Sequence, residues 1–198
     1  MRNKGQYKFI RFKEELSQEL FTDFFDYYYS GLIRFAAPIV KSEVLAEEVV
    51  LDIFLKLWEN RKTLERIENI GTYLYISVRN RSINILKKEK RFHFDMLKDS
   101  NIQLAGYKPS AESKLIEQEM FKVLNDAVAN LPSKCKIIFK LIREDGLTRN
   151  EVAQVLNISV KTVDNQIAIA VKKIAEQLQI DLSNPGNSIS LKTFLLTL

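Results

Sequence analysis

The chain has 198 residues, of which 46% are hydrophobic and 28% charged, the composition of a globular protein with enough apolar surface to form a core. A single Cys and a single His exclude an intrachain disulfide framework and a Cys-rich zinc site. The net charge of +5 permits a nucleic-acid partner without requiring one.

Apolar residues recur at intervals of three and four, the period of an α-helix, and predict an all-α fold. The N-terminal stretch MRNKGQYKFIRFKEE lacks the apolar core of a signal peptide, and no uncharged apolar run reaches the ~18 residues that span a bilayer. We therefore expect a cytoplasmic protein. The first expected helix is aromatic-rich and covers residues 17–40, with Ser17 as its N-cap and with Gly31 and Pro38 bending or breaking it.

The clearest amphipathic helix is expected from Ser42 to Asn60. Its buried stripe comprises Ala46, Val49, Val50, Ile53, Phe54 and Leu57. The opposite face is charged and carries Glu48, Asp52 and Lys56. Leu51 and Leu55 make the apolar arc wider than one core contact requires, which is typical either of deep burial or of a patch kept for a partner.

A third helix is expected to open at Gly71 and Thr72, and its C-terminal half is dense in Lys and Arg. The helical period is then lost, and Gly106 and Pro109 indicate a linker. The expected organisation is a first helical domain, a linker, a second helical domain and a tail, at residues 17–94, 95–111, 112–180 and 181–198.

The second half restarts with a helix from Glu112 to about Asn130. Pro132 is expected in the first turn of the next helix, and Gly146 is expected to end that helix in the left-handed conformation. The apolar position of Cys135 early in this helix predicts that its thiol is buried.

The segment LTRNEVAQVLNISVKTVDNQIAIAVKKI has the pattern of a helix-turn-helix. Thr148 and Glu151 have the spacing of a capping box, Asn157 can end the first helix in the left-handed conformation, and Ser159 can cap the second. The second helix has a polar N-terminal face, the part that a DNA-binding helix-turn-helix presents to base edges in the major groove. A plain helical hairpin is the alternative interpretation.

Three segments, in order, resemble an extracytoplasmic-function sigma factor, the smallest architecture of the bacterial sigma-70 family. They are LAEEVVLDIFLKLWEN, GTYLYISVRNRSINILKKEKR, and LPSKCKIIFKLIREDG continuing into the helix-turn-helix. The resemblance runs from about Phe21 to about Leu178. It implies two helical domains joined by a flexible linker, without enzymatic activity, cofactor or metal. The first would bind the clamp helices of RNA polymerase and open the −10 element, and the second would bind the −35 element and the polymerase flap.

Carried over to this sequence, the resemblance implies a polymerase-binding face made of Glu48, Leu51, Asp52, Leu55 and Trp58. Acidic groups around an apolar centre would provide both electrostatic steering and burial. Leu51 departs from the family, which commonly has Gln there.

The resemblance implies two DNA-binding sets. For the melted −10 strand they are Arg79, Asn80, Arg81, Asn84, Lys87, Lys88 and Arg91, where amides contact extruded bases and cations hold phosphates. For the −35 element they are Val160, Lys161, Thr162, Asn165, Gln166, Lys172 and Lys173. Asn and Gln can pair bidentately with adenine and Lys with guanine, while Lys172 and Lys173 suit phosphates.

The sequence leaves two other classes of function open. One is a stand-alone helix-turn-helix regulator whose first half binds a ligand or dimerises. The other is an enzyme with a metal site on the carboxylates Glu43, Glu47, Glu48 and Asp52, which lacks a matching Glu-x-x-His pattern elsewhere. The family also implies control by an anti-sigma factor, frequently one anchored in the inner membrane.

Overall fold

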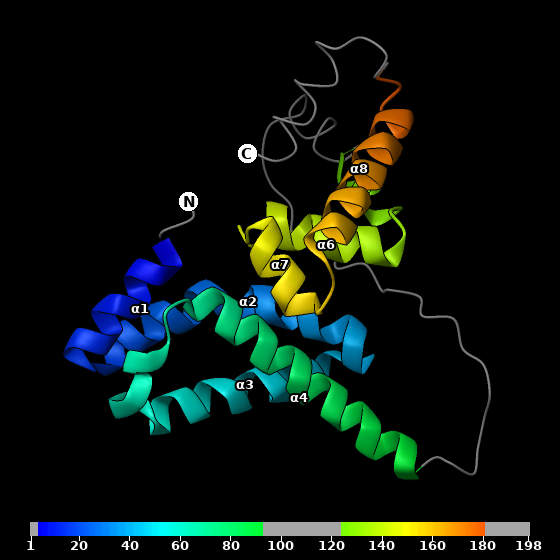
Figure 1. The fold of residues 1–198 in the computed structure, drawn as a ribbon. Coiled ribbons are helices and arrows are strands. Elements are labelled where there is room, and N and C mark those ends of the chain that lie inside the picture. Colours follow the sequence, from blue (N-terminus) through cyan, green and yellow to red (C-terminus); the bar gives the residue numbers. More distant parts are fainter. Residues whose placement is uncertain (1–3, 93–123, 181–198) are drawn as a thin grey trace, which may run out of the picture. The chain divides into compact units, whose positions relative to one another are not determined.

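The computed structural model describes residues 4–92 and 124–180, and every regular element in those two ranges is helical. The expected all-α fold with two helical bodies is confirmed (Figure 1). The first unit contains helices α1 to α4, and the second contains α6 to α8. The expected linker and tail, at residues 95–111 and 181–198, lie outside the described residues.

Helix α1 (Lys4–Glu15) precedes the residues for which the sequence predicted a helix. It packs against α2, α4 and the short helix η1, and it buries Phe9 and Phe12 completely. Gln6 ties α1 to the start of α4, since its Oε1 accepts a hydrogen bond from the Ile70 amide at 3.1 Å and its Nε2 donates to the Glu68 carbonyl at 2.9 Å. This helix is therefore part of the first unit's core.

Helix α2 (Gln18–Val40) begins as expected, with the Ser17 hydroxyl accepting a hydrogen bond from the Leu20 amide at 3.3 Å. The sequence predicted that Gly31 and Pro38 bend or break this helix. The expected break was wrong, because α2 continues as one helix through both residues. Pro38 lacks the N–H that would donate to the carbonyl four residues earlier, so the helix loses one hydrogen bond there. Burial of neighbouring apolar side chains outweighs that loss.

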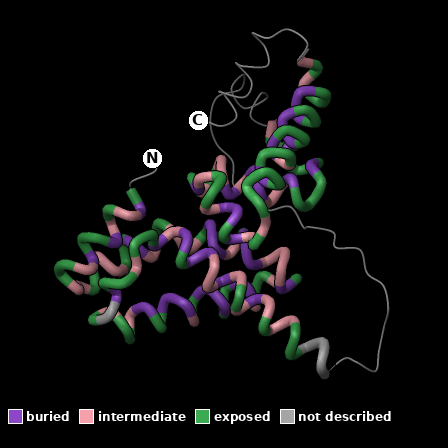
Figure 2. Tube along the Cα trace, viewed as in Figure 1, coloured by how far each residue is buried: buried purple, intermediate pink, exposed green. Residues whose placement is uncertain are grey.

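Helix α3 (Glu43–Glu59) is capped by Ser42, whose hydroxyl accepts from the Leu45 amide at 3.3 Å. The predicted buried stripe is confirmed in full, since each of its members is at most 8% exposed (Figure 2). The short 3-10 helix η1 (Arg61–Arg66) and then α4 (Ile70–Phe92) follow. Helix α4 starts close to the expected Gly71, with the Asn69 side chain accepting from the Thr72 amide at 2.9 Å.

An aromatic cluster joins α1, α2 and α3. The ring of Phe12 lies 5.1 Å from that of Phe21 and 6.2 Å from that of Trp58, and the Phe21 and Trp58 rings are 5.0 Å apart. Phe24 packs against Phe12 and Phe54 in the same cluster. The cluster fixes the end of α3 that carries Trp58.

In the second unit, residues 124–129 are helical and precede α6 (Ser133–Arg143). Pro132 is the N-cap of α6, one position before the expected first turn. Gly146 has a φ of 70°, as predicted for a left-handed end, and the Leu147 amide returns to the Leu141 carbonyl at 2.9 Å.

The helix-turn-helix has the expected form, with α7 (Arg149–Leu156) and α8 (Val160–Gln177). The capping box is formed: the Thr148 amide donates to Glu151 at 2.5 Å, and the Glu151 amide donates to the Thr148 hydroxyl at 3.1 Å. Asn157 has a φ of 54°, and Ser159 accepts from the Thr162 amide at 3.1 Å. These local contacts set the turn between the two helices.

We predict that Phe12→Ala destabilises the first unit by about 3–5 kcal/mol, because the truncation leaves a cavity among three aromatic rings. Trp58 is the chain's only Trp and touches Phe12, so urea unfolding followed by its fluorescence reports this unit. Tyr7→Ala is the matched control, since Tyr7 lies on the same helix and is 59% exposed. Equal unfolding midpoints for the two variants would mean that α1 contributes nothing to the core.

Candidate functional site

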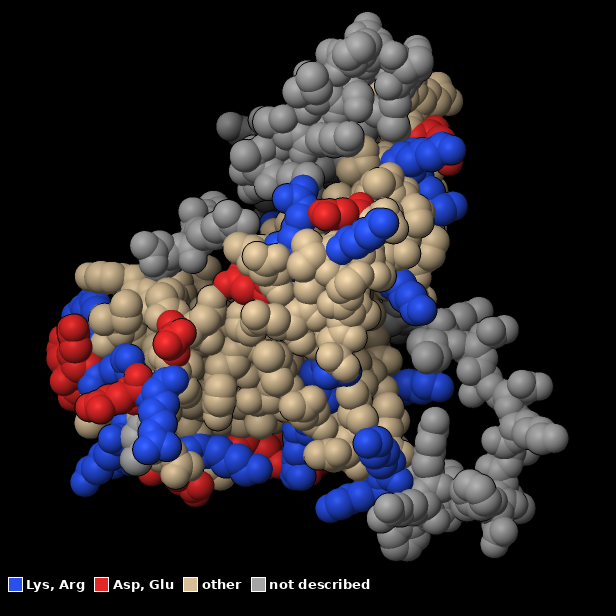
Figure 3. Space-filling view, viewed as in Figure 1, with Lys and Arg blue, Asp and Glu red and all other residues tan. Residues whose placement is uncertain are grey.

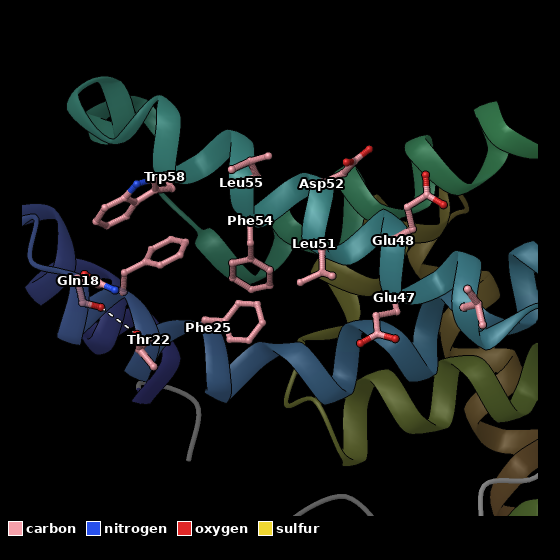
Figure 4. Close-up of a pocket in the computed structure, with 12 residues that line it drawn as sticks. Gln18, Thr22, Phe25, Glu47, Glu48, Leu51, Asp52, Phe54, Leu55 and Trp58 are labelled. Atoms are coloured by element: carbon pink, nitrogen blue, oxygen red, sulfur yellow. Dashed lines mark hydrogen bonds between the residues drawn. The ribbon is translucent and has the colours of Figure 1, made fainter.

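A groove of about 840 Å³ runs between α2 and α3 (Figure 4). All five residues predicted to bind the polymerase line it: Glu48, Leu51, Asp52, Leu55 and Trp58. Phe25 and Phe54 meet inside it with ring centroids 4.7 Å apart, and Phe21 lies beside Trp58. Residues chosen from the sequence thus come together on one surface.

The exposed part of this groove is both apolar and acidic. Leu51 is 45% exposed, Leu55 56% and Val44 76%, whereas the other large hydrophobic side chains of α3 are buried or half-buried. Glu48 and Asp52 stand beside these leucines along α3 (Figure 4). The wide apolar arc of α3 therefore reflects an uncovered face, which excludes deep burial as its explanation and leaves the partner patch as a prediction.

Two contacts fix the ends of the groove. Arg61 stacks its guanidinium 4.5 Å from the centre of the Trp58 ring and donates to the Trp58 carbonyl at 2.9 Å. At the other end, the Tyr29 hydroxyl donates to Glu47 at 2.5 Å. That hydrogen bond to Glu47 raises the pKa of Tyr29, so the phenol stays protonated and keeps donating at neutral pH. The sequence analysis had not singled out Arg61 or Tyr29.

The residues predicted to bind the −10 strand lie on α4. Asn80, Asn84, Lys87 and Lys88 are exposed, and Figure 3 shows Lys and Arg side chains gathering toward the C-terminal end of this helix. A hollow of about 370 Å³ is lined by Arg81, Asn84, Lys87 and Lys88. Arg79 is half-buried, and the side chain of Arg91 lies outside the described residues.

Arg81 differs from its neighbours because it already has an anionic partner. Its Nη2 lies 2.6 Å from Oδ2 of Asp52 on α3, and both side chains are 34% exposed. The pair joins a residue of the predicted polymerase-binding set to a residue of the predicted −10 set. Because the two residues are 29 positions apart, no local pattern in the sequence indicates it.

The predicted −35 residues lie at the N-terminal half of α8, with Lys172 and Lys173 further along. Val160, Lys161, Thr162, Asn165, Lys172 and Lys173 are exposed. The Thr162 hydroxyl also contacts the capping Ser159 hydroxyl at 2.8 Å. On the same face, Asp164 pairs with Arg149 of α7 at 2.9 Å. Arg149 adds a cation that the sequence analysis did not include.

Gln166 is the one half-buried member of this set. Its Oε1 accepts a hydrogen bond at 2.9 Å from the thiol of Cys135, which is buried as predicted. Burial raises the pKa of the Cys135 thiol, and Lys173 opposes that shift only in part, so the sulfur stays protonated and acts as the donor.

The described ranges contain no group of three or more His, Cys, Asp or Glu side chains placed to hold a metal ion. Within the same ranges, no helix combines the length and the apolar character needed to cross a membrane.

The sequence matches two family descriptions, Sigma-70 region 2 over residues 24–92 and Sigma-70, region 4 over residues 121–174. It is 22% identical to the ECF RNA polymerase sigma factor SigW of Bacillus subtilis, covering 82% of this chain and 90% of that protein. It is 25% identical to the ferric citrate uptake sigma factor FecI of Escherichia coli, covering 64% of this chain and 72% of that protein.

Two solved structures share the fold. One is the sigma factor RpoE in complex with the anti-sigma factor NepR from Bartonella quintana, with a TM-score of 0.55, 20% identity, and coverage of 81% of this chain and 98% of that chain. The other is CnrH in complex with the cytosolic domain of CnrY, with a TM-score of 0.50, 17% identity, and coverage of 89% and 98%.

Proposed function

The chain belongs to the extracytoplasmic-function group of the sigma-70 family, and we propose that it binds core RNA polymerase through the α2–α3 groove, the −10 strand through α4 and the −35 element through α8. It is an RNA polymerase sigma factor, which directs the core enzyme to promoters and starts transcription there. Members of this family are initiation factors and not enzymes, so the polymerase supplies the catalysis.

The observation that carries the polymerase-binding proposal is the convergence of its five residues on one groove. Exposed Leu51 and Leu55 offer apolar area, whose burial contributes roughly 25 cal/mol per Å². Glu48 and Asp52 supply negative charge beside them, which favours a partner surface with cations around an apolar centre.

The proposal for α4 rests on its exposed amides and cations. Unpaired bases need hydrogen-bonding or stacking partners and their phosphates need positive charge, and Asn80, Asn84, Lys87 and Lys88 offer both on one helix. The hollow lined by Asn84, Lys87 and Lys88 gives a phosphate a place beside these cations.

The proposal for α8 rests on its position in the helix-turn-helix. Val160, Lys161 and Asn165 are exposed at the N-terminal end of the second helix, the end that reaches base edges in this motif. Lys172 and Lys173 lie further along and suit phosphates. Arg149, at the first residue of α7, adds a cation where the first helix of this motif crosses the DNA backbone.

Control by an anti-sigma factor is part of the same proposal. Two solved proteins with this fold were captured with NepR and with the cytosolic domain of CnrY. We expect this chain to have a partner of that kind, which the family often anchors in the inner membrane.

We predict that Leu51→Asp and Trp58→Ala each weaken binding to purified core polymerase at least tenfold, a loss of about 1.4 kcal/mol or more. Leu51→Asp places a charge in the apolar part of the groove, and Trp58→Ala removes its end wall. Tyr27→Ala is the control, because Tyr27 is a 40% exposed aromatic of α2 that does not line the groove. Affinity for core that stays at the wild-type value in folded Leu51→Asp and Trp58→Ala would place the interface elsewhere.

We predict that Lys161→Ala and Asn165→Ala reduce promoter selection without weakening core binding. Each base contact contributes about 1–3 kcal/mol of discrimination, so run-off transcription from promoters with altered −35 elements should lose roughly five- to hundred-fold selectivity. Gln177→Ala, at an exposed position at the far end of α8, is the control. Unaltered selectivity in both test variants would show that this face does not read DNA.

The same transcription assay tests the function as a whole. Purified chain and core polymerase, incubated with genomic fragments, should start RNA at defined sites, and neither component should do so alone. A chain that binds duplex operators tightly by itself and gives no transcription with core would instead be a stand-alone helix-turn-helix regulator.

A further inference from the structure

One ion pair connects the two surfaces of the first unit. Asp52 lines the α2–α3 groove, and Arg81 lines the hollow with Asn84, Lys87 and Lys88. The Oδ2 atom of Asp52 and the Nη2 atom of Arg81 are 2.6 Å apart. Each charge is therefore already engaged by the other and is only partly available to a ligand on its own surface. A group that pairs with Asp52 or with Arg81 would therefore compete with the other member of the pair.

The pair is well placed to hold Arg81 in the free protein. Both side chains are about one-third exposed, so solvent screens their attraction less than that of a fully exposed pair. The Nε of Arg81 is buried and has no hydrogen-bond partner within the described residues. Asp52 is thus the anchor of this guanidinium, and its negative charge also repels a phosphate that approaches Arg81.

We propose that the Asp52–Arg81 pair couples polymerase binding to DNA binding. A cationic side chain of the polymerase that pairs with Asp52 in the groove releases Arg81, which then holds a phosphate of the melted −10 strand. By linkage the effect is reciprocal, because a phosphate on Arg81 leaves Asp52 free for the polymerase. Arg81 is then a DNA contact only in the assembled complex. This inference rests on the proposed function.

The chain contains a matched control for Asp52. Glu48 lies one turn earlier on α3, lines the same groove and is exposed, and no ion pair of its carboxylate is seen among the described residues. Glu48→Gln and Asp52→Asn change the net charge equally, but only Asp52→Asn removes the anionic partner of Arg81. A difference in DNA binding between these two variants therefore reports the loss of the ion pair and not the change in net charge.

The test measures DNA binding by the free full-length chain. The probe is a fluorescein-labelled single strand of twelve thymidylates, which reports phosphate contacts without a promoter sequence, and the readout is anisotropy at several salt concentrations. We expect Asp52→Asn to bind about three- to ten-fold more tightly than wild type, and Glu48→Gln to differ less than two-fold. One added phosphate contact should also steepen the slope of log K against log salt by about 0.7 in Asp52→Asn.

Arg81→Gln should give no gain in binding by the free chain, because it leaves the Asp52 carboxylate unpaired and offers no new cation to a phosphate. Asp52→Asn combined with Arg81→Gln should lose the gain of the single variant. Circular dichroism melting of each variant confirms that it is folded, and Asp52→Glu, which keeps the charge of the pair, should bind as wild type does.

Equal gains in Asp52→Asn and Glu48→Gln, or no gain in folded Asp52→Asn, would overturn the coupling. Neither result would affect the proposed function, since wild-type chain would still direct core polymerase in the transcription assay. Failure of that assay with a normal Asp52→Asn gain would instead remove the functional premise and leave the pair as a property of the fold.

Discussion

Aromatic packing covers one side of α3 and leaves the other side open. Phe12, Phe21 and Phe24 from α1 and α2 surround Phe54 and one face of Trp58. These contacts and α4 cover the buried stripe of α3, whereas Leu51 and Leu55 beside it stay about half exposed. The same packing that stabilises the helix thus leaves an exposed apolar surface, which the proposed contact with the polymerase would cover.

Leaving that surface open costs free energy in the isolated chain. Fully burying a side chain of this size contributes about 1.5–3 kcal/mol, and Leu51, Leu55 and Val44 each keep much of their area in water. A partner that covers them recovers part of that free energy. The neighbouring carboxylates keep the face charged while it is uncovered, and they favour a cationic partner over indiscriminate hydrophobic contact.

Sequence reasoning succeeded where the deciding interactions are local. The predicted caps at Ser17 and Ser159 act within a few residues, and so does the Thr148 and Glu151 box. It failed where contacts are distant in sequence. Helix α1 is rich in charge and has few apolar residues, and it is fixed by contacts such as Gln6 with Ile70, 64 residues away. The prediction of a break at Pro38 took account of the backbone donor that proline lacks. It did not take account of the tertiary packing along α2, which keeps the helix continuous.

The candidate site shows the same division between features set by local sequence and features set by contacts distant in sequence. The groove residues follow from helical period together with the family resemblance, because both place them on one face of α3. The partners that modify the site lie on other helices: Arg81 for Asp52, Arg61 for Trp58 and Arg149 for Asp164. The exposed ion pair between Arg149 and Asp164 contributes at most about 1 kcal/mol. It therefore affects the charge of this face of α8 but does little to hold the side chains in one geometry. No periodic pattern encodes such pairs.

Gln166 shows how one distant contact could change what a predicted recognition residue reads. From sequence, its amide could pair bidentately with adenine, which requires its oxygen and its nitrogen to face the same base. The protonated Cys135 thiol, 31 residues earlier, donates to that oxygen and directs it toward the interior of the unit. With its oxygen engaged in this way, the Gln166 amide could offer the bidentate pattern of adenine only by giving up the Cys135 contact. If α8 reads the −35 element as proposed, this contact would weigh against adenine at that position.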